Sequence, residues 1–150
     1  MENTRREFVL SSLMAAFAAR ALAQQEATAQ QKKPITSQAV PFDQIPVRTA
    51  EDGRESRPCV DGVTPNVGVE MHQTKLPPGK MPHPPHRHAH DELFLIRTGT
   101  ATVTIAGKAT TLGPGGYAII TGNDEHGIKN TGDVPAEYFV VALRKPGSPD

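Results

Sequence analysis

Residues 101–112 read ATVTIAGKATTL, a pattern typical of two strands joined by a turn. Its first half alternates apolar residues with threonines, and a period of two predicts a strand with one buried face and one exposed face. Ala106-Gly107 then predicts a two-residue hairpin turn into a second strand over 108–112. The stretch is therefore expected to be a β-hairpin that covers a core with one face.

The same strand and turn signals continue on both sides of this hairpin. No stretch after residue 60 shows the 3.6-residue period of an amphipathic helix. At least seven short strands are expected, with turns rich in Gly, Pro, Asn and Asp between them, and this pattern predicts an all-β sandwich or barrel. Besides the hairpin, the expected strands are 67–72, 92–97, 117–121, 126–130 and 137–143.

Two of the expected strands are apolar on both faces. These are the runs LFLI at 93–96 and YFVV at 138–141. A strand without a polar face must be covered on both sides. One cover is the barrel interior, and the other is either the N-terminal segment or a second subunit; we favour a homodimer.

Length and composition exclude several classes of protein. The chain has 150 residues, which suits one domain with one core. It has 16 Lys+Arg against 16 Asp+Glu and no basic stripe, which argues against nucleic acid as a partner. The single cysteine, Cys59, cannot form an intrachain disulfide or a thiolate zinc cage. A buried small side chain is the expected role of Cys59, and a reactive or intermolecular thiol is the alternative.

The N-terminal residues 1–23 have the layout of a cleaved signal peptide. A charged start precedes a weakly apolar, Ala-rich run over 8–19, which is too short to span a bilayer, and a small-x-small end follows at 21–23. Residues 4–10, TRREFVL, resemble the twin-arginine export signal. This resemblance implies export of a folded protein to the periplasm or beyond, with no membrane span left after cleavage. An ordinary secretory signal and an N-terminal helix of a cytoplasmic protein are the alternatives.

The rest of the chain divides into three parts. Residues 24–60 are expected to be an extended or partly flexible segment, because they are polar and interrupted by prolines. Residues 61–145 carry the strand signals and are expected to form the barrel. Residues 146–150 are a short tail.

Four of the six histidines fall within residues 83–90. His86 and His88 are two residues apart, so on an extended strand both imidazoles project from the same face. Glu92 shares their parity, but a straight strand would carry it ~13 Å beyond His88. The acid can meet the histidines only if the chain turns around 89–91. His126, which follows a turn elsewhere in the sequence, is a candidate for a fourth ligand.

Three imidazoles and one carboxylate would leave positions open on a five- or six-coordinate ion. Such a set suits Mn, Fe, Ni, Co or Cu, with Zn as a further option, and does not suit a closed structural zinc site. Around it, we expect His90 on the pocket rim, Phe94 and Ile96 in an apolar pocket wall, and Asn130 holding the turn around His126. His72 and His83 are interpreted as surface or hydrogen-bonded residues.

The histidine-rich segment resembles the first sequence motif of the cupin family, G-x5-H-x-H-x3,4-E-x6-G. His86, His88, Glu92 and Gly99 fall at the family spacings, and Gly79 lies one residue farther away than the motif has it. The extra residue only lengthens a loop.

The second cupin motif, G-x5-P-x-G-x2-H-x3-N, is matched at Gly115, His126 and Asn130. Thr121 stands for the proline and Asn123 for the second glycine. Asn is the non-glycine residue that best adopts a left-handed turn, so the second exchange is physically mild. The resemblance covers about 67–143 and implies a jelly-roll barrel (a double-stranded β-helix) with His86, His88, Glu92 and His126 as metal ligands.

The resemblance implies a site but not a reaction, because cupin oxidases, dioxygenases, isomerases and decarboxylases share these ligands. The first hypothesis is a metal-dependent enzyme that acts on a small oxygen-rich organic molecule, with Glu92 as ligand and general base. The alternative is a non-catalytic protein that stores or senses a metal or small ligand. Export of a folded protein would let the site fill with Mn or Fe in the cytoplasm, before it meets Cu or Zn.

Overall fold

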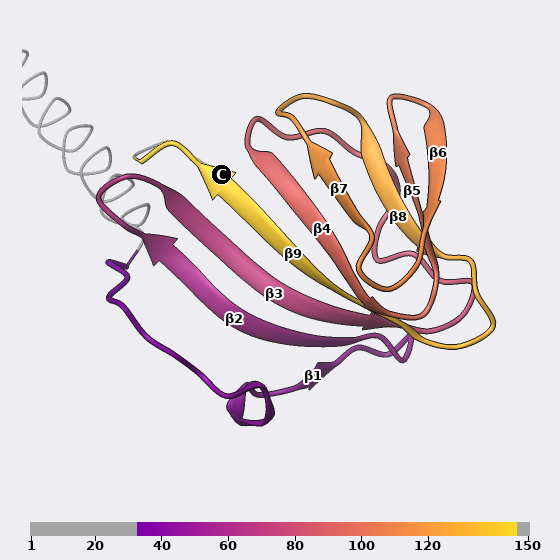
Figure 1. The fold of residues 1–150 in the computed structure, drawn as a ribbon, viewed down its shortest axis with the longest axis horizontal. Helices are drawn as coiled ribbons and strands as arrows, with labels where there is room; N and C mark the ends of the chain where they lie inside the picture. Colours follow the sequence, from indigo (N-terminus) through magenta and orange to yellow (C-terminus); the bar gives the residue numbers. More distant parts are fainter. Residues whose placement is uncertain (1–32, 147–150) are drawn as a thin grey trace, which may run out of the picture. The chain divides into compact units, whose positions relative to one another are not determined.

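A computed structural model describes residues 33–146 of the chain (Figure 1). The expected signal peptide at 1–23, the start of the segment 24–60 and residues 147–150 of the tail lie outside the described residues. Within the described part, no helix is long and apolar enough to cross a membrane.

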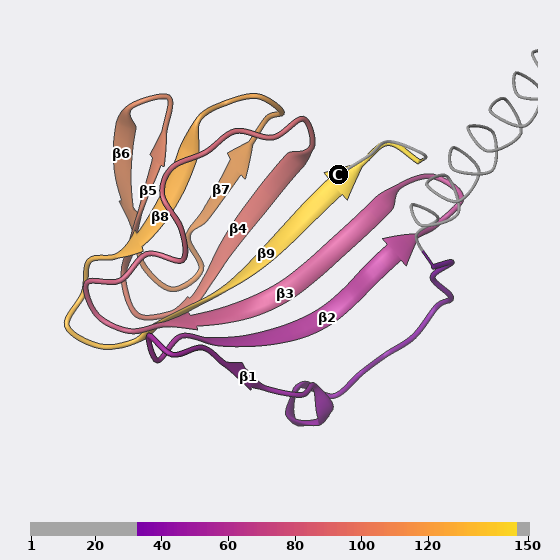
Figure 2. The same ribbon diagram turned by 180° about the vertical axis from the view of Figure 1, so that it is seen from behind.

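The described residues form nine strands in two antiparallel sheets (Figures 1 and 2). The larger sheet has the order β1-β2-β3-β9-β4-β7 and the smaller one the order β6-β5-β8. The prediction of an all-β jelly-roll fold is confirmed. The elements are η1 (a 3₁₀ turn, Phe42–Gln44), β1 (Arg48–Thr49), β2 (Glu55–Val63), β3 (Gly68–Leu76), β4 (Asp91–Thr98), β5 (Ala101–Ile105), β6 (Lys108–Leu112), β7 (Tyr117–Ile120), β8 (His126–Asn130) and β9 (Ala136–Arg144).

The predicted hairpin is formed by β5 and β6. Ala106 and Gly107 both have positive φ angles, 47° and 81°, as a tight two-residue turn between antiparallel strands requires. β5 also pairs with β8, with Ile105 opposite His126, so the hairpin supports the strand that begins at the candidate ligand.

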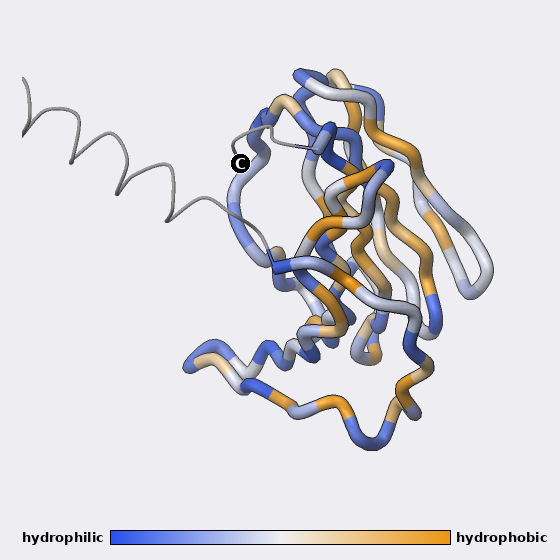
Figure 3. Tube along the Cα trace, turned by 90° about the vertical axis from the view of Figure 1, so that its left-hand side faces the viewer, coloured by the Kyte–Doolittle hydropathy of each residue, from blue (hydrophilic) through white to orange (hydrophobic). Residues whose placement is uncertain are grey.

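The core lies between the facing sheets, and the strand register determines which residues enter it. Even-numbered residues of β3, β9 and β4 share the inner face, because Thr74 pairs with Tyr138 and Tyr138 with Ile96. Figure 3 shows apolar residues interspersed with polar ones along the trace. The buried apolar cluster comprises Leu76, Phe94, Ile96, Ala101, Val103, Ile120, Ile128, Ala136, Tyr138 and Val140.

β2 runs across the boundary that the sequence places between residues 60 and 61. It pairs with β3 along its whole length, so the larger sheet begins within the segment expected to be extended or partly flexible. The register shifts between Pro58 and Val60. A proline lacks a backbone N–H and fits a strand best at such an irregularity, and the shift also hides the alternation that would have predicted this strand.

The N-terminal segment covers part of the outer face of the larger sheet. The Phe42 ring packs edge-on against Phe139 of β9 at 6.3 Å, and the Arg97 guanidinium lies 4.3 Å from the centre of the Phe42 ring. Farther along this face, Leu95, Tyr117 and Ile119 are 48%, 66% and 57% exposed. The N-terminal segment therefore covers the outer face of β9 at Phe42. The homodimer stays a prediction.

Candidate metal centre

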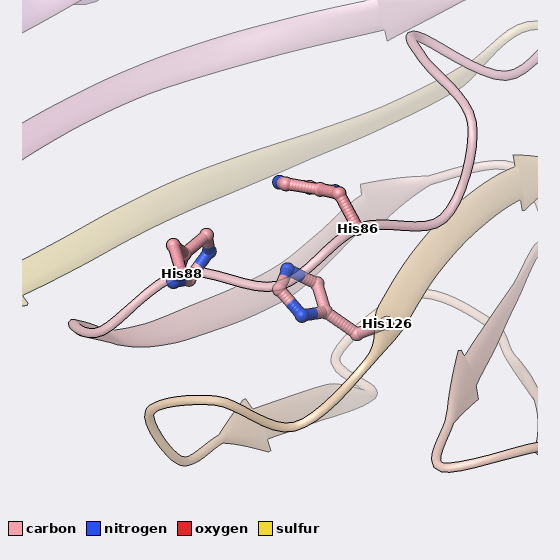
Figure 4. A group of neighbouring side chains, drawn as sticks. All are labelled: His86, His88 and His126. Carbon is pink, nitrogen blue, oxygen red and sulfur yellow. The ribbon is translucent and has the colours of Figure 1, made fainter.

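His86 and His126 lie directly opposite each other on adjoining backbone segments. The His86 N–H donates to the His126 carbonyl and the His126 N–H to the His86 carbonyl, both at 3.0 Å. Residues that exchange both hydrogen bonds project their side chains on the same face of an antiparallel pair. His88, two residues further on, keeps that face, and Figure 4 shows the three imidazoles gathered together.

The turn between β7 and β8 holds the segment that carries the two histidines. The Asn123 N–H donates to the His88 carbonyl at 2.7 Å, and the Arg87 guanidinium donates to the Asn123 carbonyl at 2.9 Å. Asn123 has a φ of 71°, the left-handed conformation for which the sequence motif has glycine. The Gly122 N–H donates to Asp91 at 2.9 Å.

One ring nitrogen from each of the three histidines lies within 4.8 Å of the others. The ring centroids are 5.3 Å apart for His86 and His88 and 4.7 Å apart for each of these rings and His126. The ring planes meet at 49° to 71°, so their in-plane lone pairs point in different directions. Rings inclined in this way can direct three nitrogens at one ion.

Glu92 joins the cluster because the chain bends at residues 89 and 90, where the sequence requires a turn. One carboxylate oxygen, Oε2, lies 3.1 Å from His126 Nε2 and 3.7 Å from His88 Nε2. The expected set of three imidazoles and one carboxylate is thus brought together on the inner face of the barrel.

The hydrogen bonds show which nitrogens carry protons. Nδ1 of His88 lies 2.9 Å from the His90 carbonyl, and Nδ1 of His126 lies 2.9 Å from the Asp124 carbonyl. A carbonyl only accepts hydrogen bonds, so each Nδ1 is the donor, and Nε2 presents a lone pair whenever the ring is neutral. In His126 that lone pair faces the Glu92 carboxylate at 3.1 Å.

Two facing acceptors require a cation between them, either a proton or a metal ion. Nε2 of His88 and Nδ1 of His86 are also buried without a hydrogen-bond partner. Burial lowers the pKa of His86, and the neighbouring His83, His126 and His88 lower it further. A neutral imidazole is the form that binds metals. The donor set therefore fits a divalent transition metal ion.

His90 stacks on His88, with ring centroids 3.6 Å apart and planes 4° from parallel. His88, His90 and Glu92 form a second group with ligand atoms within 4.8 Å. Imidazole lone pairs lie in the ring plane, so an ion in the plane of His88 is out of the plane of His90. In this conformation the first group, completed by Glu92, is the better metal site, and His90 is its neighbour.

The expected pocket residues Phe94 and Ile96 both belong to the buried apolar cluster, and the Phe94 ring lies 6.2 Å from that of His126. Asn130 is fully buried at the far end of β8. Its amide donates to the carbonyls of Leu76 and Val134 and accepts from the Gly132 N–H. The turn that it holds therefore follows β8, and is not the turn around His126 that the sequence suggested.

Two residues near the centre carry no signal of their own in the sequence analysis. Asp91 fixes the turn at Gly122, and Asp124 orients His126 through its carbonyl. The ring of His83, which was interpreted as a surface or hydrogen-bonded residue, lies 4.3 Å from that of His86. The only indication of these contacts in the sequence is that each of the three residues lies within three positions of an expected ligand.

The fold and the cluster define an all-β barrel with three imidazoles and a carboxylate arranged to hold a divalent ion. Residues 72–142 match the Cupin_2 family, described as the cupin domain. The resemblance to cupins expected from the sequence is confirmed for this domain and for the fold. No curated protein shows a significant sequence match.

Solved structures share the fold at low sequence identity. An RmlC-like cupin from Shewanella frigidimarina is 13% identical with a TM-score of 0.60, covering 78% of this chain and 96% of its own. A sugar phosphate isomerase from a cupin superfamily, from Silicibacter pomeroyi, is 25% identical with a TM-score of 0.59, covering 73% and 77%. A predicted oxalate decarboxylase from Thermotoga maritima is 20% identical with a TM-score of 0.57, covering 71% and 99%.

Proposed function

We propose that this protein is an exported, metal-dependent enzyme of the cupin type that acts on a small oxygen-rich organic molecule. The observation that carries the proposal is the approach of His126 Nε2 to the Glu92 carboxylate at 3.1 Å, next to the buried unpartnered nitrogens of His86 and His88. Four ligands are fewer than the five or six that most divalent transition metals accept, which leaves room for a substrate oxygen.

A divalent ion bound by these ligands supplies Lewis-acid polarisation of a substrate oxygen or, if redox-active, activation of dioxygen. The residues of the chain have separate tasks. Backbone pairing fixes His86 and His126, and carbonyls that accept from the rings orient His88 and His126. Glu92 is the group able to take a proton from a bound molecule. Phe94 provides a buried apolar surface beside His126, which excludes water from one side of the site.

The names of two structural relatives agree with the substrate class. One name refers to a sugar phosphate and the other to oxalate, both of which are small and oxygen-rich. The reaction type for this chain remains within the oxygenase, isomerase and decarboxylase classes.

Export and metal identity form one linked part of the proposal. The twin-arginine-like residues 4–10 support export after folding, because that pathway carries folded proteins. Folding in the cytoplasm would let the site take up Mn or Fe, whereas an unfolded chain reaching the envelope would bind Cu or Zn by affinity. Rerouting the protein through the unfolded export pathway should replace Mn or Fe by Cu or Zn; unchanged metal would contradict this part.

We also propose a homodimer through the outer face of β4 and β7. Leu95, Tyr117 and Ile119 are adjacent on that face, because Leu95 pairs with Tyr117 and Leu93 with Ile119. A second copy of the chain is the occupant that presents a matching apolar strip by two-fold symmetry.

A Glu92→Gln variant separates catalysis from binding. Wild-type protein, Glu92→Gln and the exposed control Glu51→Gln are loaded with Mn²⁺ or Fe²⁺, checked for metal content, and incubated with a small-molecule extract of the native cells. We expect wild type and Glu51→Gln to consume at least one component over time, and Glu92→Gln to remain folded and to consume none. A component that wild type binds but never changes would favour the non-catalytic binding protein.

A further inference from the structure

The inner face of the larger sheet continues well beyond the metal ligands. Glu70 pairs with Ala142, and Ala142 pairs with Glu92, so Glu70 and Glu92 point to the same side two strand spacings apart, about 10 Å. Two residues farther along the same strands, His72 and Phe94 both pair with Val140. Apart from Glu92, the face is apolar over β9, β4 and β7, whereas polar residues such as Arg48, Glu70 and His72 predominate over β1, β2 and β3.

The polar half of this face is hollowed into a cleft of about 380 Å³. Its size suits a small organic molecule. None of the four metal ligands lines it, so it is a separate compartment on the same face. The lining residues are Arg48, Thr49, Ala50, Arg54, Ser56, Pro58, Glu70, His72 and Thr74.

Two guanidinium groups give the cleft its charge. Arg48 of β1 pairs with Ser56 of β2, which places it on the inner face in the row of Thr74. Arg54 donates one hydrogen bond to the Pro82 carbonyl at 3.3 Å, and Pro82 belongs to the segment that leads to His86. A guanidinium has five N–H donors, so this bond leaves most of the Arg54 donors for a ligand. Paired guanidinium groups bind carboxylate and phosphate oxygens through several charge-assisted hydrogen bonds.

The single lining carboxylate does not cancel this preference, because two guanidinium charges outnumber it. Glu70 Oε1 lies 2.8 Å from His72 Nδ1. When the His72 ring is neutral, its Nδ1–H donates to the carboxylate, and Nε2 becomes an acceptor for a hydroxyl group. The cleft thus combines donors for an anionic group with an acceptor for a hydroxyl.

Tyr138 connects the cleft with the metal centre. It pairs with Thr74, a lining residue, and its ring lies 6.0 Å from that of Phe94. The Phe94 ring in turn lies 6.2 Å from that of His126. The two compartments are therefore linked through two packed aromatic rings.

We propose that this cleft is the subsite for the anionic end of the substrate. Arg48 and Arg54 bind an oxyanion, and the His72–Glu70 pair accepts a hydrogen bond from a neighbouring hydroxyl. An oxygen at the other end of the same molecule then reaches the metal ligands. This inference rests on the proposed function for the role of the metal, and it narrows the substrate class to hydroxylated organic acids or phosphate esters. Carboxylate and phosphate share the required chemistry.

The test uses three matched probes: gluconate, glucitol 6-phosphate and the neutral glucitol. Binding is followed by calorimetry and by nitrogen-15 NMR, on metal-free protein and on protein loaded with Zn²⁺. The variants are Arg48→Gln, Arg54→Gln and the double substitution, with the exposed β8 residue Lys129→Gln as the charge-matched control.

We expect one of the two anions to bind metal-free protein and to shift the backbone resonances of Thr49, Ser56 and Thr74, with glucitol at least about tenfold weaker. Each arginine substitution should weaken anion binding by about tenfold, and Lys129→Gln should leave it unchanged. Which anion binds more tightly identifies the carboxylate or the phosphate class.

Four results would overturn the subsite. The first two are equal affinity for glucitol and both anions, and no binding of either anion. The third is unchanged anion affinity in the double variant. The fourth is an equal loss in Lys129→Gln, which would indicate general attraction instead of a site. Anion binding in the metal-free protein would stand even if the protein bound no metal, so the subsite and the proposed function can fail separately.

Discussion

Gly122 is the residue at which the metal centre is most sensitive to a single added carbon. It opens the turn between β7 and β8, and its backbone lies against Ala89, in the bend between His88 and Glu92. A Cβ on Gly122 would overlap the Ala89 carbonyl oxygen and lie 3.0 Å from the carbonyl carbon. Both partners are backbone atoms, so neither can rotate away. Gly122→Ala must therefore push the turn and the bend apart.

The cost follows from this contact. Carbon atoms prefer a separation of about 3.5–4.0 Å, so the two segments must part by roughly 0.5–1 Å. Forced overpacking of this kind costs about 1–3 kcal/mol. Loss of the exposed hydrogen bond from Gly122 to Asp91 adds about 0.5–1 kcal/mol, and the stiffer unfolded chain returns a similar amount. We expect a net loss of about 1–3 kcal/mol, which for a chain of this size lowers Tm by about 3–10 °C.

The same displacement moves the Asn123 hydrogen bond away from His88 and disturbs the approach of His126. Changes in groups that orient metal ligands weaken metal affinity by about 10–100-fold. Thermal unfolding followed by circular dichroism, and Zn²⁺ titration against a competing chelator, measure the two effects. Gly113→Ala is the control, because a Cβ there meets nothing within 4 Å. If both variants have the same Tm and the same Zn²⁺ affinity, the turn at Gly122 does not position the metal ligands.

Three further predictions concern the fold. Asn130→Ala should lower the free energy of unfolding by about 3–5 kcal/mol in urea titrations, because it removes the buried amide that bonds to two carbonyls and one N–H. The exposed control Asn66→Ala should change this free energy little. Burial raises the pKa of the Cys59 thiol, so less thiolate is present at pH 8 and iodoacetamide should label native protein more slowly than urea-unfolded protein; equal rates would contradict this. Ile119→Lys should convert the dimer to a monomer in light scattering, while Thr111→Lys should not; a wild-type monomer would refute the dimer.

Local features of the fold were predictable from the sequence. The hairpin over 101–112 carries its alternation and its turn in twelve consecutive residues, and the structure follows both. β2 was missed, because a register shift beside Pro58 interrupts its alternation and its partner is β3, which no local pattern identifies. Pairing between strands is decided by the whole sheet, not by the strand itself.

The candidate site was likewise predictable only in its local features. The turn needed to bring Glu92 back to His88 could be derived from strand geometry alone, and the bend lies at the expected residues. Asn130 was assigned to the wrong turn, since its partners at Leu76 and Val134 come from segments that only the folded barrel brings together. The stacking of His90 on His88 depends on side-chain rotation, which spacing does not determine.

The arginine-lined cleft could not be predicted from the sequence for the same physical reason. Arg48 and Arg54 lie in a segment expected to be extended or partly flexible, and nothing near them in sequence suggests a site. The pairing of β1 with β2 and of β2 with β3 places Arg48 in the row of Thr74, and a hydrogen bond to the Pro82 carbonyl holds Arg54. Glu70 and His72 are two residues apart, but only the folded sheet brings them to the same cleft as the arginines.

Metal stoichiometry is the direct test of a metal centre built from His86, His88, Glu92 and His126. Wild-type protein, the double variant His86→Gln/His126→Gln and the control His72→Gln are purified, equilibrated with one divalent metal, freed of excess ion and analysed for metal per chain. We expect one ion per chain in wild type and in His72→Gln, and almost none in the double variant, with all three folded. A wild type without metal, or a double variant that retains one ion per chain, would contradict this expectation.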